Sequence, residues 1–450
     1  MKCLLDRLST CKASDALWVA DPFGAIDITR LTQVLNSVDS SGWQGKRVAI
    51  GALPVVEFVS ALAFLDGLAQ AIVLLPAEDD LPTREARLSQ AGIDIVVDGD
   101  GFGFAKLLAQ SDTNGSSGTA HPAVVDRPTA IQTIWLLPTS GTTGTPKLIA
   151  HTFATLTRSM TTRRIGDDYT WGSLYSLRRF AGLQVFLQSW MCGTPLILNE
   201  EGADLHDVLT RFIDLGCNAL SATPSMWRKL AMHPLFDRLI LKQITLGGEI
   251  VDQAVLDMLA KRFPAARITH IYASTEAGVG FAVRDGLAGF PSDYLLHPPL
   301  GVAMRIDDQD HLWFGTAADQ SLVAGAENDW IDSGDVVETQ ADRVRFLGRA
   351  NGSINVGGNK VMPEEIESVI KELPEVAFVQ VRAHKSAMLG SLVEAAITPV
   401  PGTDIDAAFK KRVTAHCRAR LDGFKVPAFI VAADAIQLTA SGKLSRMTVE

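Results

Sequence analysis

The chain has 450 residues, of which 47% are hydrophobic and 20% are charged, and its formal net charge is −10. This length is sufficient for two or more domains with large buried cores. The excess of acidic residues argues against a chain-wide binding surface for nucleic acid or for anionic lipid. The composition therefore favours a globular protein that binds neither nucleic acid nor membranes.

The cysteines and the apolar segments indicate the cellular setting. The five cysteines are scattered, without metal-ligand spacing or a visible disulfide framework: Cys3, Cys11, Cys192, Cys217 and Cys417. The opening residues MKCLLDRLST contain no signal-peptide core. Polar residues and a proline interrupt the most apolar segment, 61–77, which predicts a core helix running into a strand and not a membrane span. We expect a cytoplasmic protein.

The first three quarters of the chain alternate short aliphatic runs with segments of helical periodicity. Strands are predicted at 46–53, 71–76, 93–98, 134–138 and 267–274, and helices at 56–70, 84–92, 204–216 and 251–263. Residues 111–130, rich in Ser, Gly, Thr and Pro, predict a surface loop. Strand–helix alternation of this kind predicts an α/β fold with largely parallel sheets.

The pattern changes near Gly348. Residues 342–348 are predicted to form a hairpin strand. After them come a predicted helix, two strands and another helix, at 363–373, 376–384, 391–400 and 406–421. This order predicts a small α+β domain of about 100 residues behind a large α/β domain.

The stretch LLPTSGTTGTPKLIAHT, residues 136–152, is the most informative local signal. Its Thr, Ser and Gly residues offer hydroxyls and unhindered N–H groups that can surround phosphate oxygens, and Lys147 adds a positive charge. The loop leaves the predicted strand 134–138, at a strand end where open α/β sheets bind ligands. A solvated polar loop is the alternative. The spacing does not match a Walker A loop, since no Ser or Thr follows the Lys.

TSGTTGTPK resembles the phosphate-loop signature of the adenylate-forming superfamily, which comprises acyl-CoA synthetases, peptide-synthetase adenylation domains and luciferases. Four further motifs follow in the family's order, and the resemblance is thin only over residues 1–120. It implies an N-terminal domain at 1–348, a hinge at 349–352 and a mobile C-terminal domain at 353–450. Within the loop it implies that Lys147 is catalytic. The implied nucleotide-binding residues of the loop are Thr139, Ser140, Gly141, Thr142, Thr143 and Gly144.

The motif IYASTEAG is similar to the family's Tyr-Gly-x-Thr-Glu motif. The resemblance implies that Tyr272 packs on adenine, that Thr275 binds the α-phosphate and that Glu276 holds Mg²⁺, with Ala273 and Ser274 beside the nucleotide. An aromatic face, a hydroxyl and a carboxylate suit these tasks. Ala273 stands where Gly is common, which narrows the acyl pocket or the thiol channel. By itself the stretch would also fit a helix N-cap.

Two further motifs extend the expected nucleotide site. WIDSGDVVE resembles the family's Thr-Gly-Asp strand, with Ser333 in place of Thr. Asp335 is expected to accept bonds from both ribose hydroxyls, which suits a carboxylate with two oxygens. LGGEIV is a weaker match that implies Gly247, Gly248 and Glu249 next to the acyl group and adenine.

The remaining motifs lie at the domain boundary and beyond it. FLGRANGSINVGGNK resembles the hinge motif and the loop after it. Arg349 is expected to contact ribose and phosphate. Asn351 takes the place of the usual hinge Asp and tolerates unusual backbone angles. Asn355, Gly357 and Gly358 are expected to form the CoA (thiol) loop.

Near the end of the chain, LTASGKLSR resembles the family's last motif. By this match Lys443 is the catalytic lysine, which bonds both the substrate carboxylate and the α-phosphate. A lone lysine so close to the end of a chain would otherwise be interpreted as solvated.

The acyl pocket is expected around the mostly apolar segment 176–186, which suits an aryl or aliphatic acid. Its predicted lining residues are Phe180, Gly182, Leu183 and Trp227. An amino-acid substrate would need an Asp near the start of this segment, whereas the chain has Arg178 and Arg179. These arginines either bind a second acidic or carbonyl group of the substrate or are solvated.

The resemblance implies ATP-dependent activation of a small carboxylic acid to an acyl adenylate, with Mg²⁺ and release of pyrophosphate, followed by transfer to CoA. Transfer to the phosphopantetheine thiol of a carrier protein acting in trans, or to an amine, is the alternative. A non-catalytic ligand-binding protein is a third hypothesis, against which the complete motif set argues. The chain is expected to act as a monomer or homodimer.

The motif order generates a first prediction, based on two orientations of the C-terminal domain. Lys443→Ala should abolish ATP–pyrophosphate exchange and spare thiolysis of a supplied acyl adenylate, because the lysine is needed only for adenylation. Loss of one such contact is expected to cost about 2–4 kcal/mol of transition-state stabilisation. Radiolabel exchange and thioester formation measure the two half-reactions. Equal loss of both would exclude the two-orientation scheme.

Overall fold

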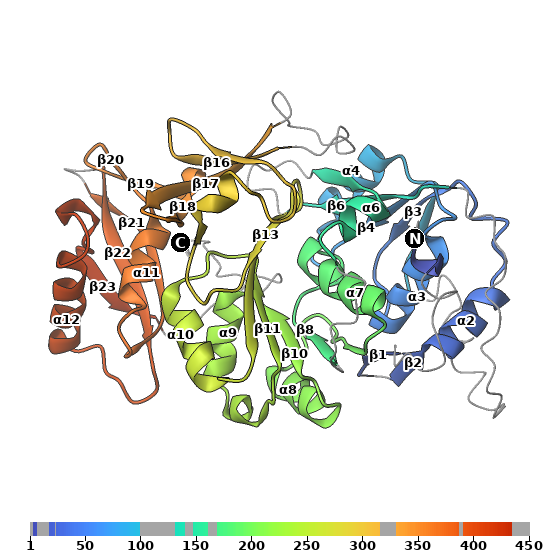
Figure 1. Cartoon of the computed structure of the whole chain (residues 1–450), viewed down its shortest axis with the longest axis horizontal. Coiled ribbons are helices and arrows are strands. Elements are labelled where there is room, and N and C mark those ends of the chain that lie inside the picture. The colour runs from blue at the N-terminus through green and yellow to red at the C-terminus, as the bar shows by residue number, and fades with distance from the viewer. Residues whose placement is uncertain are drawn as a thin grey trace.

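The computed structural model describes residues 3–6, 18–22, 24–99, 131–139, 147–160, 169–315, 330–386 and 390–433. The predicted loop at 111–130, residues Ser140 to Gly144 and Lys443 lie outside these ranges. The predicted α/β class is confirmed: two sheets with parallel strands occupy the larger N-terminal part, and a small α+β unit follows it (Figure 1). Within the described residues, no helix is both long enough and apolar enough to cross a membrane.

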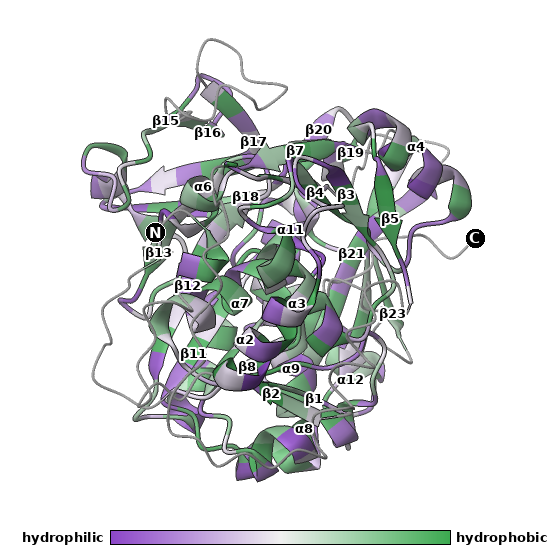
Figure 2. Ribbon diagram, turned by 90° about the vertical axis from the view of Figure 1, so that its right-hand side faces the viewer, coloured by the Kyte–Doolittle hydropathy of each residue, from purple (hydrophilic) through white to green (hydrophobic). Residues whose placement is uncertain are grey.

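The first sheet has the strand order β5-β3-β4-β6-β7, in which only β7 runs antiparallel to its neighbour. Its strands are β3 (Arg47–Ile50), β4 (Ala71–Leu74), β5 (Ile95–Val97), β6 (Ile134–Pro138) and β7 (Leu148–His151). Helices α3 (Val55–Leu65) and α4 (Leu81–Ala91) connect the parallel strands. Helix α4 lies beside β5 and mixes hydrophilic with hydrophobic residues (Figure 2), as expected of a surface helix.

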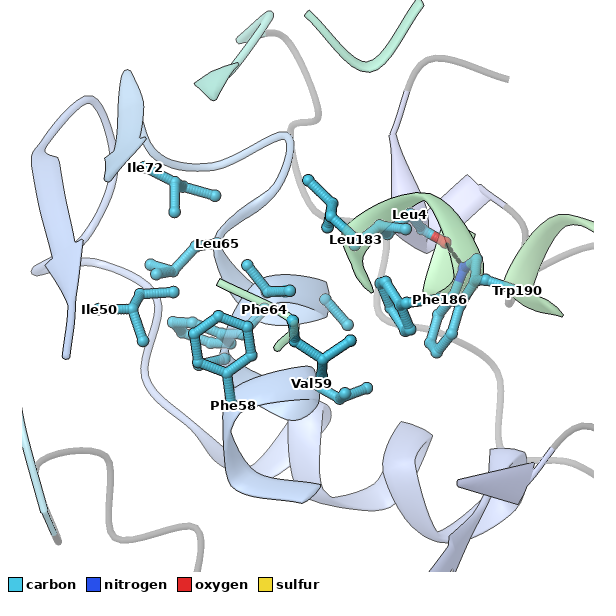
Figure 3. Packing of buried hydrophobic residues seen from close by; sticks show 14 of the residues in the cluster. Leu4, Ile50, Phe58, Val59, Phe64, Leu65, Ile72, Leu183, Phe186 and Trp190 are labelled. Carbon is cyan, nitrogen blue, oxygen red and sulfur yellow. Dashed lines mark hydrogen bonds between the residues drawn. The ribbon is translucent and has the colours of Figure 1, made fainter. Parts of the chain in front are cut away.

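Every residue of α3 is buried. Phe58, Val59 and Phe64 of α3 lie between strand residues of the first sheet and α7 (Phe180–Cys192), whose Phe186 and Trp190 face them (Figure 3). A helix that is apolar all round is stable only inside a core. Helix α3 therefore joins the first sheet to the second.

The second sheet has the order β13-β12-β11-β10-β8-β9-β1-β2, parallel from β12 to β1, with antiparallel strands β13 and β2 at its edges. Its strands are β1 (Trp18–Asp21), β2 (Gly24–Asp27), β8 (Trp171–Ser173), β9 (Leu196–Ile197), β10 (Ala219–Ala222), β11 (Gln243–Gly247), β12 (Arg267–Ser274) and β13 (Gly278–Val283). The other helices of this part are α2 (Ile28–Ser37), α6 (Phe153–Thr157), α8 (Leu205–Asp214), α9 (Pro224–Ala231) and α10 (Gln253–Arg262).

A third, antiparallel sheet has the order β14-β18-β17-β16-β15. Its strands are β14 (Phe290–Pro291), β15 (Met304–Ile306), β16 (His311–Gly315), β17 (Trp330–Gln340) and β18 (Arg343–Arg349). Its apolar face, with Phe290 of β14 and Phe314 of β16, forms one hydrophobic cluster with side chains of β13 such as Phe281.

The C-terminal unit begins after β18 and has its own core. It comprises β19 (Ile354–Val356), β20 (Asn359–Val361), α11 (Pro363–Ile370), β21 (Val376–Ser386), β22 (Gly390–Pro399), α12 (Ala407–Arg418) and β23 (Phe429–Ala432). Strands β19 and β20 form a hairpin whose turn residues, Gly357 and Gly358, both have positive φ. The unit packs beside β18, where Gly348 leaves room for the Glu364 side chain.

One ion pair connects the C-terminal unit with the larger part. Lys371 Nζ lies 3.7 Å from Asp252 Oδ2. Asp252 also caps α10 through the Val255 N–H, at 3.0 Å, and pairs with Arg228 at 2.5 Å. Burial alone would raise the pKa of Asp252, but Arg228 and Lys371 hold it below its usual range.

Element boundaries agree with the sequence where a local signal is strong. Strand β12 covers the predicted 267–274, and Gly92 ends α4 in the left-handed conformation. Helix α3, predicted to reach residue 70, ends at Leu65 because Gly67 adopts a positive φ of 87°. Helix α4 begins three residues earlier than predicted because Asp80 accepts the Thr83 N–H at 2.9 Å.

Asp66, the residue after α3, is almost fully buried. Its carboxylate accepts the Leu4 N–H at 2.7 Å and the Trp135 indole N–H at 3.0 Å. Burial raises the pKa of Asp66 to about 7. The folded protein therefore retains a proton here over a pH range in which the unfolded chain has lost it.

This titration predicts a pH dependence of stability. Between about pH 4 and pH 7 the Asp66 contribution should fall as pH rises, by at most about 1.4 kcal/mol per pH unit. Asp66→Asn removes the titration, so the unfolding free energy of wild type minus variant should decrease over this range. Chemical denaturation at several pH values measures the difference. Parallel pH profiles of the two proteins would contradict the prediction.

Candidate functional site

The carboxyl ends of β8, β10, β11 and β12 meet at one edge of the second sheet, where open α/β sheets place their ligands. At this edge the Tyr175 hydroxyl, just after β8, donates to the Gly247 carbonyl at 3.1 Å. Gly248 has φ +83°, a conformation that favours glycine. Glu249 accepts the Ser225 N–H at 2.9 Å, in the first turn of α9. The three residues predicted from LGGEIV thus lie at this edge, and their contact with the acyl group and adenine stays a prediction.

Three predicted nucleotide residues come together from three strands. The Tyr272 hydroxyl, on β12, donates to Asp335 Oδ2 on β17 at 2.5 Å. Arg349 Nε, at the end of β18, lies 2.9 Å from Asp335 Oδ1, and Arg349 Nη1 donates to the Ser333 carbonyl at 2.6 Å. Asp335 is 4% exposed, whereas Arg349 is exposed. Tyr272 and Arg349 therefore help to orient the carboxylate from its two oxygens.

The Tyr272 ring lies in an aromatic stack. It is nearly parallel to the rings of Phe281, Phe314 and Phe346, at centroid distances of 5.3, 5.0 and 5.3 Å. Burial, together with the adjacent Asp335 charge, raises the pKa of Tyr272 well above its usual value. The hydroxyl therefore remains protonated and donates to Asp335. Packing of this ring on adenine stays a prediction.

The turn between β12 and β13 carries Thr275 and Glu276, both partly exposed. Within the turn, the Ser274 hydroxyl accepts the Ala277 N–H at 3.0 Å. The Thr275 carbonyl is 2.7 Å from His151 Nε2, and the Ala277 carbonyl accepts from Arg158 Nη2 at 3.2 Å. The turn is thus held from outside by His151, the last residue of β7, and by Arg158, which follows α6.

Glu276 is the candidate Mg²⁺ ligand. In the described part of the chain, no group of three or more His, Cys, Asp and Glu side chains could hold a metal ion. Mg²⁺ commonly uses one or two carboxylates and takes its other ligands from phosphates and water. A single partly exposed carboxylate next to Thr275, the predicted phosphate ligand, would fit such an ion.

Of the predicted phosphate loop, the structure describes the two ends, Thr139 and Lys147. The Thr139 N–H donates to the Lys147 carbonyl at 3.0 Å, which closes the loop between the antiparallel strands β6 and β7. The Lys147 side chain is exposed. Residues Ser140 to Gly144, like the catalytic candidate Lys443, lie outside the described residues.

The hinge and thiol-loop candidates are exposed. Asn351 lies in a short 3₁₀ turn, Ala350–Gly352, that follows β18. Asn355 Oδ1 accepts the Gly358 N–H at 2.9 Å and so stabilises the β19–β20 turn that also contains Gly357. The roles of these residues stay predictions.

The acyl-pocket candidates divide into two groups. Phe180 packs against His151, with ring centroids 5.7 Å apart, and Gly182 has no room for a Cβ because the Ser176 backbone lies against it. Leu183 and Trp227 have no exposed surface and belong to the hydrophobic core. Phe180 and Gly182 thus pack against neighbouring segments of the protein, and the acyl-pocket role of all four residues stays a prediction.

Of the two arginines before α7, Arg178 is buried, whereas Arg179 is partly exposed. Arg178 donates to the carbonyls of Gly51 and Leu53, with Nη2 to oxygen distances of 2.9 and 3.1 Å. Its Nη1 also lies 3.3 Å from Glu201. Arg179 pairs with Glu78. The two guanidinium groups therefore connect the start of α7 with the loop after β3 and with the segment before α4.

Sequence reasoning missed His151, Arg158 and Tyr175. All three act on backbone carbonyl groups, which leave no residue pattern in the sequence. The one available signal is a histidine at the end of the strand that follows the phosphate loop, directly before the Thr152 cap of α6.

Comparisons with known proteins agree with this arrangement. The chain matches the family described as AMP-binding enzyme over residues 60–312, and AMP-binding enzyme C-terminal domain over residues 365–443. It is 26% identical over 326 residues to 2-succinylbenzoate–CoA ligase of Listeria monocytogenes, a match that covers 68% of each protein. It is 27% identical over 357 residues to surfactin synthase subunit 1 of Bacillus subtilis, which covers 69% of the chain and 10% of that protein.

Among solved structures, a benzoate CoA ligase from Burkholderia xenovorans superposes with a TM-score of 0.76 at 17% identity and covers 99% of both chains. Fold and site together define the adenylate-forming class. The chain belongs to the AMP-binding enzyme family. This confirms the resemblance predicted from the motifs, and the predicted class of AMP-forming acid–thiol ligase agrees with the names of the CoA ligases among these relatives.

The Tyr272–Asp335 contact gives a prediction. Tyr272→Phe keeps the aromatic stack but removes one of the two donors that orient Asp335. We expect ATP affinity to fall about tenfold, because a small misplacement of a binding group is costly. Tyr294→Phe is the matched control, since Tyr294 belongs to the same aromatic cluster and its hydroxyl contacts only the Ala282 carbonyl in the described structure. Titration calorimetry measures the ATP affinity of both variants. Equal losses of affinity would contradict the assignment of Tyr272 and Asp335 to the nucleotide site.

Proposed function

We propose that this chain is an ATP-dependent acid–CoA ligase, which converts a small carboxylic acid, ATP and CoA into an acyl-CoA thioester, AMP and pyrophosphate. The observation that carries the proposal is the convergence of Tyr272, Asp335 and Arg349 beside the Thr275–Glu276 turn, in a chain of the AMP-binding enzyme family. The site lies at the carboxyl edge of the parallel sheet. A cytoplasmic location is part of this proposal.

The reaction has two steps. A carboxylate is a poor acyl donor because its leaving group would be oxide. Attack of a carboxylate oxygen on the α-phosphorus of ATP forms the acyl adenylate and breaks the bond to pyrophosphate. The CoA thiol, after losing its proton, then attacks the acyl carbon and AMP leaves. The protein has to hold two anions together while negative charge builds up at phosphorus.

The described residues suit the nucleotide half of this task. Tyr272 donates to one Asp335 oxygen and Arg349 pairs with the other. A carboxylate has about four acceptor sites, and Asp335 would use its remaining ones for the ribose hydroxyls. The Thr275 hydroxyl and Lys147 would donate to phosphate oxygens. Lys443 would bridge the substrate carboxylate and the α-phosphate. Glu276 would hold Mg²⁺, which supplies positive charge at the phosphates when it is bound.

The domain organisation suits the second half-reaction. A rotation at 349–352 about Asn351 would withdraw Lys443 and bring the β19–β20 turn, with Asn355, Gly357 and Gly358, towards the acyl adenylate. That turn is short and exposed, and Asn355 pre-organises it.

The substrate is proposed to be a monocarboxylic acid with an uncharged aryl or aliphatic body. Phe180 offers an aromatic wall at the start of α7. The charges of Arg178 and Arg179 are compensated by Glu201, Glu78 and backbone carbonyls, so neither is available to a second carboxylate. A second charge in this pocket would be desolvated without a partner, which is costly.

A panel of acids tests the proposal. Benzoic-type monocarboxylic acids should support ATP–pyrophosphate exchange with a kcat/KM at least about a hundredfold higher than the same rings bearing a second carboxylate. AMP release should then depend on CoA, and loaded carrier proteins and amines serve as comparison acceptors. Absence of exchange with every acid would refute the ligase assignment. Preference for the dicarboxylic acids would refute only the substrate class.

A further inference from the structure

His151 occupies an unusual position for a buried histidine. It is the last residue of β7, which follows the phosphate loop directly, and it is 2% exposed. Its ring packs against Phe180 at the start of α7, and its Nε2 reaches the Thr275 carbonyl, 124 positions along the chain. One imidazole thus contacts two of the predicted site segments and belongs to a third.

The direction of the hydrogen bond follows from the chemistry of the partners. A carbonyl oxygen only accepts, so His151 Nε2 must carry the proton and donate it over 2.7 Å. Nδ1 lies 3.2 Å from the Thr155 hydroxyl and can accept from it. Burial lowers the pKa of His151, so the neutral imidazole is the form that makes this bond. The tautomer is therefore determined by the structure.

The bond acts on a short and otherwise lightly held turn. Residues 275–277 form the turn, and Ser274 supplies one internal contact to Ala277. From outside, His151 binds the Thr275 carbonyl and Arg158 binds the Ala277 carbonyl. Both external donors come from 148–158, the segment that continues from the phosphate loop. These two side chains therefore fix the turn relative to the segment 148–158.

We propose that His151 is a positioning residue for ATP activation: its Nε2–H···O=C bond to Thr275 sets the place of the Thr275 hydroxyl and the Glu276 carboxylate relative to the strand that leaves the phosphate loop. The inference rests on the proposed function. Since a displacement of about 1 Å at a reacting centre can cost about a hundredfold in rate, this bond controls turnover without touching substrate.

The chain offers a matched control. His270, on β12, is also buried, its Nε2 lies 3.0 Å from the Leu287 carbonyl, and burial lowers its pKa too. Its partner loop lies away from Thr275 and Glu276 in sequence and belongs to no predicted site segment. Loss of stability from removing a buried imidazole should be similar at both positions, whereas an effect on catalysis should appear at only one.

The experiment compares His151→Leu, His151→Gln and His270→Leu in the full chain. His151→Leu should lower kcat for ATP–pyrophosphate exchange about 10- to 100-fold. It should also weaken the binding of ATP about tenfold, whereas KM for the acid should change less than about threefold. The amide of His151→Gln can donate a hydrogen bond from a similar place, so kcat of this variant should lie within about fivefold of wild type. His270→Leu should lower the melting temperature but retain kcat within about threefold.

Each other outcome decides against one hypothesis. If His151→Leu keeps wild-type kcat and ATP affinity, the positioning role is refuted. It is also refuted if kcat falls as much in His270→Leu as in His151→Leu. If Gln does not rescue, the donor is not the relevant property and the inference also falls. If wild type binds ATP but shows no exchange with any acid, the ligase proposal fails, and the comparison of ATP affinities alone then decides the role of His151.

Discussion

A nearly buried carboxylate must have partners, and in this protein that constraint organises the candidate site. Asp335 is almost without contact to water, with Tyr272 on one carboxylate oxygen and Arg349 on the other. Leaving such a charge unpaired would cost several kcal/mol. The requirement connects β12 of the large sheet with β17 and β18 of the antiparallel sheet, and the stack of Tyr272 on three phenylalanines strengthens the same junction. The predicted ribose site is thus also the place where two sheets are joined.

The remaining parts of the site are held mainly through backbone carbonyls. His151 and Arg158 hold the turn after β12, Tyr175 holds the end of β11, and Arg178 ties the start of α7 to the loop after β3. Carbonyl groups do not change with the side chain, so such contacts constrain the path of the chain more than its composition. The side chains proposed to face ligand, such as Thr275, could then vary while their positions are retained.

The sequence was informative where function or folding depends on side-chain pattern. Aliphatic runs that alternate with helical periodicity predicted the parallel strands, and the motifs identified Tyr272, Asp335 and Arg349, which converge as expected. It was uninformative where the partner is a distant carbonyl. Arg178 meets Gly51 across 127 positions, and no residue type marks which carbonyl will lie opposite. The end of α3 was misjudged for a related reason: Leu68 continues the apolar periodicity, while the positive φ of Gly67 has already turned the chain.

The Asp252–Lys371 pair bears on how the small domain leaves its docked position. When Lys371 departs, Asp252 keeps Arg228 and the α10 N–H, so no charge is stranded in a dry environment. Lys371 is itself already partly in contact with water, and it gains further hydration. Breaking this one ion pair therefore leaves no buried charge unpaired, and dissolved salt would weaken its attraction further. If the C-terminal unit rotates as proposed, this ion pair could break and re-form while the core of each unit stays folded.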